Sequence, residues 1–185
     1  SSILKIKEKN LLLKDKYLLS FRAIYENYRI LEIVKSRNKS CPNKPIYFVY
    51  PSFDSLYINE VKKYLKPFDK LLGKVDKEKL YSLMSNSIAT ISIPISDSSP
   101  RSVYESIFSG APTILQDNPY QDFMTESMKS RVVTINITDI KNSHWLSKSI
   151  KEAFNISEDF SPCKLSYEKF DSELILKSTY KSLYK

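Results

Sequence analysis

Glycine is scarce in this chain, which contains only Gly73 and Gly110 among its 185 residues. The GxGxxG fingerprint and the Walker A loop each need closely spaced glycines to bring the backbone against a phosphate. Neither motif can therefore exist here. A phosphate site in this chain has to use the N-terminus of a helix together with arginine side chains.

Metal-binding and redox residues are equally rare. His144 is the only histidine, no Asp-x-Asp sequence occurs, and Cys41 and Cys163 lie in separate polar segments without a CxxC pattern. This composition offers no candidate for a metal-bridged diphosphate site and predicts two unpaired, reduced thiols. We expect no metal and no cofactor. We interpret His144, just before a predicted helix, as a surface or capping residue.

Long apolar runs are also absent. No stretch approaches the roughly 20 apolar residues that a membrane-spanning helix needs. The first ten residues, SSILKIKEKN, lack the apolar core of a signal peptide. We therefore expect a cytoplasmic protein. Its basic surface could attract anionic lipid as a peripheral contact at the inner membrane face.

The net charge of +8 raises the question of nucleic-acid binding. The lysines are scattered along the chain, and no RNP, zinc-finger or helix-turn-helix pattern accompanies them. We therefore expect no nucleic-acid partner. Four tyrosines on the apolar sides of predicted helices are expected to pack in the core rather than to stack on bases: Tyr57, Tyr64, Tyr81 and Tyr104.

The chain does contain a regular alternation of β-rich and helical segments. Strands separated by helices need crossover connections, which produce a parallel sheet covered on both faces. The sequence thus predicts an α/β fold. Strands are expected at Tyr17 to Phe21, Pro45 to Tyr50, Phe68 to Leu72, Ile88 to Ile93, Thr113 to Leu115 and Val132 to Ile137. Helices are expected at Glu26 to Arg37, Tyr57 to Leu65, Lys77 to Met84, from Pro100 to before Gly110, and at Leu146 to Phe154.

One globular domain accounts for the whole length. Hydrophobic residues make up 42% and charged residues 27% of the chain, which is ordinary for a protein that buries a core. Residues 1–15 are expected to be a linker into the first strand, Asn155 to Lys164 a flexible link, and residues 165–185 a final helix. Apolar residues such as Phe170 and Leu174 lie on more than one side of that helix, so it is expected to contact a second partner.

The stretch SDSSPRSVYESIFSGAPTIL, from Ser96 to Leu115, has the pattern of a strand end, a turn, a short helix and a second strand. Ser98 and Ser99 suit the N-cap of that helix. Pro100 suits its first turn, and Gly110 suits the left-handed residue after its end. A helix that begins there directs its free N–H groups and positive dipole end beyond the preceding strand, which favours a phosphate.

The same stretch resembles the donor-site signature of retaining glycosyltransferases of family four, which have the GT-B fold. In that family an acidic residue, seven intervening residues and a glutamate precede a turn rich in Ala and Met and a Gly-x-Pro strand start. Asp97, Glu105 and the Gly-Ala-Pro sequence at Gly110 match these positions. Ser98 and Ser106 stand where the similar variant of the signature has Gly and Ala.

Two distant segments agree with this resemblance. Lys16 to Ile30 is similar to the family's first strand and the arginine-bearing turn after it, which makes Arg22 the candidate diphosphate ligand. Asn27 stands where many relatives have a lysine, so either Arg29 replaces that positive charge or the charge is absent. Phe170 to Lys185 resembles the final helix that crosses back to the N-terminal domain.

The resemblance implies a Rossmann-like domain that forms the C-terminal half of a GT-B enzyme, with an N-terminal domain outside this sequence. Asp97 and Arg22 would be the catalytic residues, because Asp97 would hold hydroxyls of the donor sugar and Arg22 would neutralise the diphosphate. Glu105 would accept hydrogen bonds from the ribose hydroxyls. Further substrate-binding residues would be Ser98, Ser99, Pro100, Arg101, Ser102, Arg29, Gly73 and Val75. Gly73 lies where the family's backbone meets the nucleobase.

The implied activity is the metal-independent transfer of a hexosyl unit, with retention, from a nucleotide-diphosphate sugar to a glycan or lipid-linked acceptor in polysaccharide biosynthesis. This chain alone is expected to be an inactive half, because half of the interdomain cleft is missing. A nucleotide-sugar-binding module without turnover and a sugar-nucleotide epimerase of the same architecture are the alternatives. The base, the sugar and the acceptor stay open.

Ordinary structural roles also stay open for the same residues. Glu105 could form an i,i+4 ion pair with Arg101, worth only about 0.3 to 0.5 kcal/mol. Arg22 could be a structural ion-pair partner, and Asp97 an ordinary turn residue. Arg29 could be a solvated helix charge, just as Gly73 could mark a plain turn.

Overall fold

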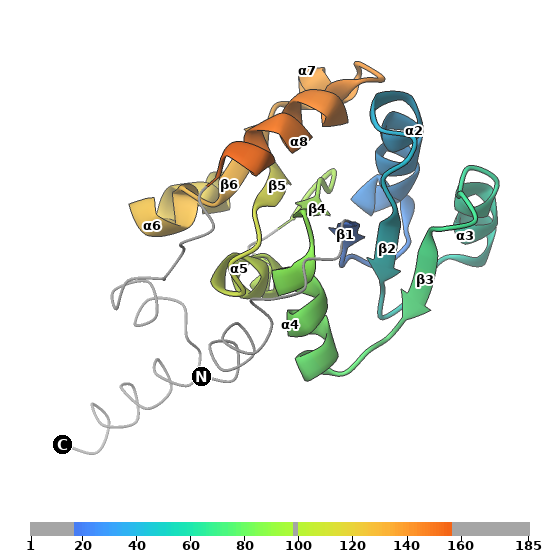
Figure 1. Cartoon of the computed structure of the whole chain (residues 1–185), viewed down its shortest axis with the longest axis horizontal. Coiled ribbons are helices and arrows are strands. Elements are labelled where there is room, and N and C mark those ends of the chain that lie inside the picture. Colours follow the sequence, from blue (N-terminus) through green and yellow to red (C-terminus); the bar gives the residue numbers. More distant parts are fainter. Residues whose placement is uncertain (1–16, 98–99, 157–185) are drawn as a thin grey trace.

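Six short parallel strands form one sheet in the order β3-β2-β1-β4-β5-β6 (Figure 1). The structure is a computed structural model and describes residues 17–97 and 100–156. The strands are β1 (Leu18–Ser20), β2 (Ile46–Val49), β3 (Lys70–Gly73), β4 (Ala89–Ser92), β5 (Thr113–Gln116) and β6 (Val132–Ile135). Every neighbouring pair is parallel, which confirms the predicted α/β fold.

Helices cover both faces of this sheet, as Figure 1 shows. One face packs against α2 (Ile30–Ser40), α3 (Ser55–Lys62) and α8 (Trp145–Asn155). The other face packs against α4 (Lys77–Asn86), α5 (Arg101–Phe108), the 3-10 turn η2 (Pro119–Phe123) and α6 (Glu126–Lys129). The short helix α7 (Ile137–Ile140) follows β6.

Alternation along the strands explains the two layers. Successive side chains point to opposite faces, so Leu18 of β1 lies in the cluster with α2 and α8, whereas Leu19 lies in the cluster with α4 and α5. Both residues are fully buried. Such strands, buried on both faces, are typical of parallel sheets under two helical layers.

Side-chain caps determine where two of these helices begin. The Asp54 carboxylate accepts the amide hydrogen of Tyr57 at 2.7 Å and so caps α3. The Asp76 carboxylate accepts that of Lys79 at 2.8 Å and caps α4. Each bond satisfies one amide that the first helical turn leaves without an intrahelical partner.

The strand order places a topological switch point between β1 and β4. From β1 the chain moves outward to β2 and β3 on one side, and later from β4 to β5 and β6 on the other. Ser20, at the end of β1, is in register with Ile91 of β4, so the carboxyl ends of these strands lie together. In open α/β sheets, ligands bind outside the strand ends at such a point.

The predicted helix from Glu26 to Arg37 is in fact two elements. A 3-10 turn, η1 (Glu26–Tyr28), is separated from α2 by Arg29, which has φ of +49° and ψ of 39°. A left-handed conformation costs a residue with a Cβ roughly 1–2 kcal/mol. Burial of the next residue, Ile30, and contacts of the Arg29 side chain hold the break in place.

One tyrosine predicted to pack in the core is exposed. Because α3 ends at Lys62, Tyr64 lies beyond the helix and is 36% exposed; the Lys35 ammonium lies 4.8 Å from the centroid of its ring. The prediction of core packing was wrong for Tyr64, whereas Tyr81 and Tyr104 are buried as expected. Phe154, near the end of α8, is 61% exposed.

A buried ion pair lies at the amino-terminal ends of strands β2 and β3. Both guanidinium nitrogens Nη1 and Nη2 of Arg37 donate to the Asp69 carboxylate, and neither side chain is exposed. The Asp69 carboxylate also accepts the backbone amides of Ile46 at 2.8 Å and Lys66 at 2.7 Å. Arg37 in turn donates to the Lys44 carbonyl at 2.6 Å. This network joins α2 to the starts of β2 and β3.

Several predictions fall on residues that the structure does not describe. They are the linker at 1–15, the residues of the Asn155 to Lys164 link beyond Ile156, the final helix at 165–185, and Cys163. Cys41 is an unpaired thiol whose pKa is raised by burial. Among the residues described, no helix combines the length and the apolar character that crossing a bilayer requires.

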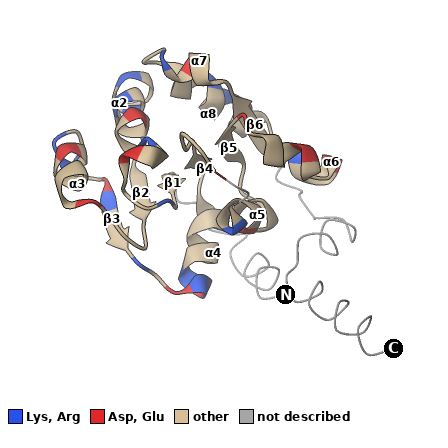
Figure 2. Ribbon diagram, turned by 180° about the vertical axis from the view of Figure 1, so that it is seen from behind, with Lys and Arg blue, Asp and Glu red and all other residues tan. Residues whose placement is uncertain are grey.

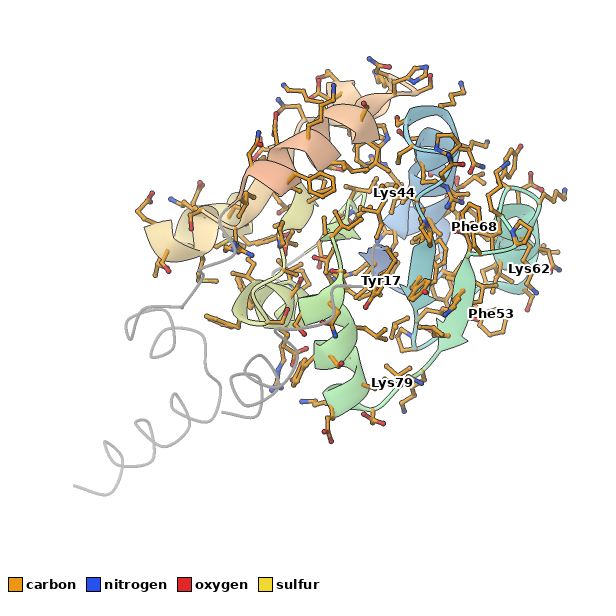
Figure 3. The ribbon with its side chains drawn as sticks, in the orientation of Figure 1. Tyr17, Lys44, Phe53, Lys62, Phe68 and Lys79 are labelled. Atoms are coloured by element: carbon orange, nitrogen blue, oxygen red, sulfur yellow. The ribbon has the colours of Figure 1, made fainter. Side chains whose placement is uncertain are left out.

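Charged side chains are mixed on the surface. Figure 2 shows Lys and Arg interspersed with Asp and Glu on the helices visible from that side. Figure 3 shows Lys62 and Lys79 on separate helices, α3 and α4, while Tyr17 lies near the middle of the molecule. This scatter is typical of a solvated surface rather than of one basic stripe.

Candidate functional site at the switch point

The loops after β1 and β4 are joined at the switch point by hydrogen bonds from Asn27. Its carbonyl accepts the backbone amide of Ile95 at 2.7 Å, and its side-chain amide donates to the Ser96 carbonyl at 3.4 Å. Asn27 occupies the position where the resembled family often has lysine. In this chain that position therefore provides loop contacts rather than a charge.

The centre of the site is an ion pair between residues 75 positions apart in sequence. Arg22, just after β1, places Nη2 at 2.7 Å from Asp97 Oδ2, and the two side chains are only 9% and 12% exposed. Arg22 Nη1 donates to the Ser102 hydroxyl in α5 at 3.3 Å. The Arg22 guanidinium also lies 4.5 Å from the centroid of the Tyr28 ring. The structure thus brings three predicted site residues, Arg22, Asp97 and Ser102, into contact.

The N-terminus of α5 lies beside this ion pair. The helix begins at Arg101, with Pro100 as the extended N-cap residue rather than the first helical residue that the sequence predicted. Ser98 and Ser99 lie outside the described residues. Gly110 follows the helix with φ of +85°, as predicted. Amides in the first turn have no intrahelical acceptor, so this end favours an anion near Arg22.

Buried hydroxyl groups attach α5 to the sheet beneath the site. The Ser106 hydroxyl lies 2.6 Å from that of Thr90 in β4 and 3.0 Å from that of Thr113 in β5. The Thr90 hydroxyl donates to that of Thr113 at 3.1 Å, and all three residues are fully buried. Ser106 stands where the similar family variant has alanine. The Ser106 hydroxyl is therefore within hydrogen-bond distance of one hydroxyl on β4 and one on β5.

Glu105 lies one turn further along α5, against α4. Its Oε1 atom is 3.1 Å from the Tyr81 hydroxyl, 3.3 Å from Arg101 Nε and 3.9 Å from Lys77 Nζ. The i,i+4 ion pair with Arg101, which the sequence left open as a purely structural role for Glu105, is therefore present. The Glu105 side chain is nevertheless only 15% exposed, because α4 covers it.

Arg29 lies on the β5 side of the switch point. Its Nη1 donates to the Gln116 side-chain carbonyl and, at 3.4 Å, to the Ile93 backbone carbonyl. Gln116 is the last residue of β5. Arg29 is thus not the freely solvated helix charge that was one alternative, and its described contacts are with the ends of β4 and β5 rather than with Asp97.

Gly73 and Val75 lie at the opposite side of the site, after the edge strand β3. Gly73 ends the strand with φ of +65°, and its carbonyl accepts the Tyr50 amide at 3.0 Å. A Cβ built on Gly73 would meet no atom within 4 Å, so the backbone is open to approach there. Val75 packs against the α4 and α5 side of the core. Gly73, at the end of β3, is two strands away from β1, which Arg22 follows.

Several residues that contact the predicted site are not predicted by the sequence. The pattern around Tyr81 predicts core packing alone, and Lys77 and Gln116 belong to no recognisable motif. Tyr120, in η2, is buried and has its pKa raised by burial and by the nearby Asp97 carboxylate. The position of Tyr81, one helix turn into α4, predicts its contact with Glu105 only if the packing of α4 against α5 is known.

The described residues contain no group of three or more His, Cys, Asp or Glu side chains placed to hold a metal ion. His144 is the N-cap residue of α8 and is exposed, in agreement with its predicted capping position. Arg22, Arg101 and Lys77 place positive charges near Asp97 and Glu105.

Glycosyltransferases are among the solved structures with the same fold. AviGT4, involved in avilamycin A biosynthesis, aligns with 96% of this chain and 53% of its own, at 14% identity and a TM-score of 0.70. A UDP-forming α,α-trehalose-phosphate synthase from Burkholderia xenovorans aligns with 97% of this chain and 48% of its own, at 7% identity and a TM-score of 0.67. The pneumococcal O-GlcNAc transferase GtfA, in complex with UDP and GlcNAc, aligns with 94% and 37%, at 18% identity and a TM-score of 0.60.

At these identities the likeness establishes the fold, a Rossmann-like α/β domain that matches GT-B glycosyltransferases. The chain spans between 37% and 53% of the length of the three structures. No family model matches the sequence, and no curated protein matches it.

Proposed function

We propose that this chain is the nucleotide-sugar-binding, C-terminal domain of a retaining glycosyltransferase similar to family four. The observation that carries the proposal is the Arg22–Asp97 pair, which lies at the switch point beside the N-terminus of α5. Rossmann-like folds bind nucleotides at this place. The GtfA neighbour was solved with UDP and GlcNAc, which are ligands of the class proposed here.

The proposed chemistry follows from where negative charge develops. As the bond between the sugar and the nucleotide breaks, charge accumulates on the leaving diphosphate. A fixed guanidinium and a helix N-terminus stabilise that charge more than they stabilise the ground state. At about 4 Å and an effective dielectric constant near 20, one unit charge pair is worth on the order of 4 kcal/mol before desolvation. Arg22 and α5 supply this positive charge, so we propose that no metal ion is needed.

The remaining predicted residues define an orientation for the nucleotide. With the diphosphate at Arg22 and Ser102, Glu105 would accept the ribose hydroxyls, and the open backbone at Gly73 would meet the base. Asp97, next to Arg22, would then hold hydroxyls of the donor sugar. This orientation runs from the switch point toward β3, along the side of the sheet that α4 and α5 cover.

A second domain would supply the acceptor site. We propose that the acceptor is a glycan or a lipid-linked glycan, and that this chain alone binds the nucleotide weakly without transferring sugar. Sugar transfer by the purified 185-residue chain would refute that proposal. Conversion of the donor to an epimer in the absence of any acceptor would instead support the epimerase alternative.

The test of the nucleotide site is calorimetry and thermal unfolding with UDP, GDP, ADP and their sugars. A ligand at 100 times its dissociation constant should stabilise the chain by about 2.7 kcal/mol. Glu105→Gln should weaken binding of diphosphate and nucleotide sugar alike, by about 1.5 to 3 kcal/mol, because it removes a charge-assisted hydrogen bond.

Glu126→Gln is the matched control. Like Glu105, Glu126 is a helical carboxylate paired with a basic residue, in this case Lys129, three positions away. It lies on α6, and its side chain is 91% exposed. Its substitution should leave every affinity unchanged. Failure of all three nucleotides to bind would remove the proposed function, and equal effects of both substitutions would remove the ribose role of Glu105.

A further inference from the structure

Tyr81 is a buried residue outside the signature whose hydroxyl meets the Glu105 carboxylate. It projects from α4 and donates to Glu105 Oε1 at 3.1 Å, across the contact between α4 and α5. Burial, followed by the neighbouring Glu105 charge, raises the pKa of Tyr81 to about 12. The phenol therefore stays protonated near neutral pH and remains a hydrogen-bond donor.

The other two contacts of Glu105 are of a different kind. Arg101 and Lys77 approach the same Oε1 atom at 3.3 and 3.9 Å, but their side chains are 68% and 67% exposed. Long exposed side chains lose conformational entropy when they are held and are screened by salt, so they fix a partner weakly. Tyr81 has few rotamers and is packed in the core, so its hydroxyl is the firm contact.

We infer that Tyr81 is a positioning residue that orients Glu105 toward a ribose and thereby makes the site select ribonucleotides over 2′-deoxyribonucleotides. This inference rests on the proposed function. The contacts described for Glu105 all use Oε1, so the second oxygen, Oε2, is the one proposed to accept from the ribose. A carboxylate accepts two neighbouring hydroxyl groups well only when its plane is fixed before binding.

The consequence for selectivity is direct. Without the Tyr81 hydroxyl, Glu105 can turn toward Arg101 or Lys77, and its plane is no longer fixed by a buried group. A ligand with both ribose hydroxyls then loses its advantage, whereas a 2′-deoxy ligand, which already lacks one hydroxyl, loses little. The ratio of the two affinities therefore reports the orientation of Glu105 rather than the stability of the fold.

The experiment is isothermal titration of the chain with UDP, GDP and ADP, each beside its 2′-deoxy counterpart. In the unaltered chain the ribonucleotide that binds should be favoured by about tenfold or more, the effect of one hydrogen bond to a charged group. In Tyr81→Phe this preference should fall to about threefold or less, mainly through weaker ribonucleotide binding. Glu105→Gln should reduce it in the same way.

Tyr17→Phe is the control for a merely structural effect. The Tyr17 hydroxyl donates to the Leu83 carbonyl at 2.7 Å and so also holds α4. Loss of either phenol hydroxyl removes one hydrogen bond of α4, and unfolding of both variants in urea shows whether they fold. Of the two tyrosine variants, only Tyr81→Phe should change the ribose preference.

The possible failures are distinguishable. If no ribonucleotide binds the unaltered chain, the proposed function falls and this inference falls with it. If a ribonucleotide binds but Tyr81→Phe keeps the full preference, or if Tyr17→Phe lowers it equally, the positioning role of Tyr81 is refuted while the proposed function stands.

Discussion

Asp97→Asn should separate the two kinds of ligand most clearly. In the free protein the Asp97 carboxylate neutralises Arg22, and both side chains are nearly buried. The substitution leaves the guanidinium without its charged partner. Breaking a buried pair costs about 3 to 5 kcal/mol. Since the asparagine carbonyl can still accept a hydrogen bond and each side chain touches solvent, we expect a loss of about 2 to 3 kcal/mol in the free energy of unfolding.

Although Asp97→Asn should destabilise the free protein, it should not weaken the binding of a nucleoside diphosphate. A nucleoside diphosphate that binds Arg22 has to compete with Asp97 for the guanidinium in the unaltered chain. Without that competition its affinity should be unchanged or higher, by up to about tenfold, which corresponds to about 1.4 kcal/mol. A nucleotide sugar gains the same electrostatic advantage but loses the proposed contact between Asp97 and its hydroxyl groups. Its affinity relative to the diphosphate should fall by about tenfold or more.

Urea unfolding gives the stability change, and calorimetry with both ligands gives the two affinities. Asp122→Asn is the control, because Asp122 is exposed in η2. A loss of affinity that is equal for the two ligands would remove the sugar-binding role of Asp97. An unchanged free energy of unfolding would show that the ion pair does not matter to the free protein, against the reasoning from its burial.

Two further predictions concern residues away from the site. Asp69→Asn should lower the free energy of unfolding by about 3 to 5 kcal/mol, because it breaks a fully buried pair, while nucleotide affinity is unchanged; a loss below about 1 kcal/mol in urea unfolding would contradict this. Cys41 should react with iodoacetamide at pH 8 more slowly in the folded chain than in urea, because burial raises its pKa and lowers the thiolate fraction. Mass mapping of the labelled peptides separates Cys41 from Cys163, and equal rates at Cys41 in both states would refute the prediction.

The order of the elements could be predicted from the sequence because each strand and helix has its own local pattern. The strand expected at Ile88 to Ile93 occurs as Ala89–Ser92, and the helix expected from Lys77 begins there because Asp76 caps it. The break at Arg29 could not be predicted, because its cause is the side chain's contacts with the ends of β4 and β5. Tertiary contacts there override a helical composition.

Part of the candidate site followed from the resemblance to glycosyltransferases of family four, which singled out Arg22 and Asp97. Arg22 comes directly after one predicted strand and Asp97 lies in the turn beyond another, and the carboxyl ends of neighbouring parallel strands meet at one edge. What the sequence could not provide was the pairing of α4 with α5, which brings Tyr81 and Lys77 to Glu105. The contact between α4 and α5 depends on how all the helices on that face of the sheet pack, and a motif within one segment does not predict this packing.

The ion pair of Arg37 with Asp69 has a consequence for engineering this chain. It fastens α2 to the starts of β2 and β3, while the candidate site lies at the ends of β1 and β4. The network and the candidate site thus lie at opposite ends of the strands. Libraries that vary the loops after β1 and β4 can be screened for nucleotide binding with this network left intact, so that loss of folding in such libraries will trace to the varied loops, the Arg22–Asp97 pair included.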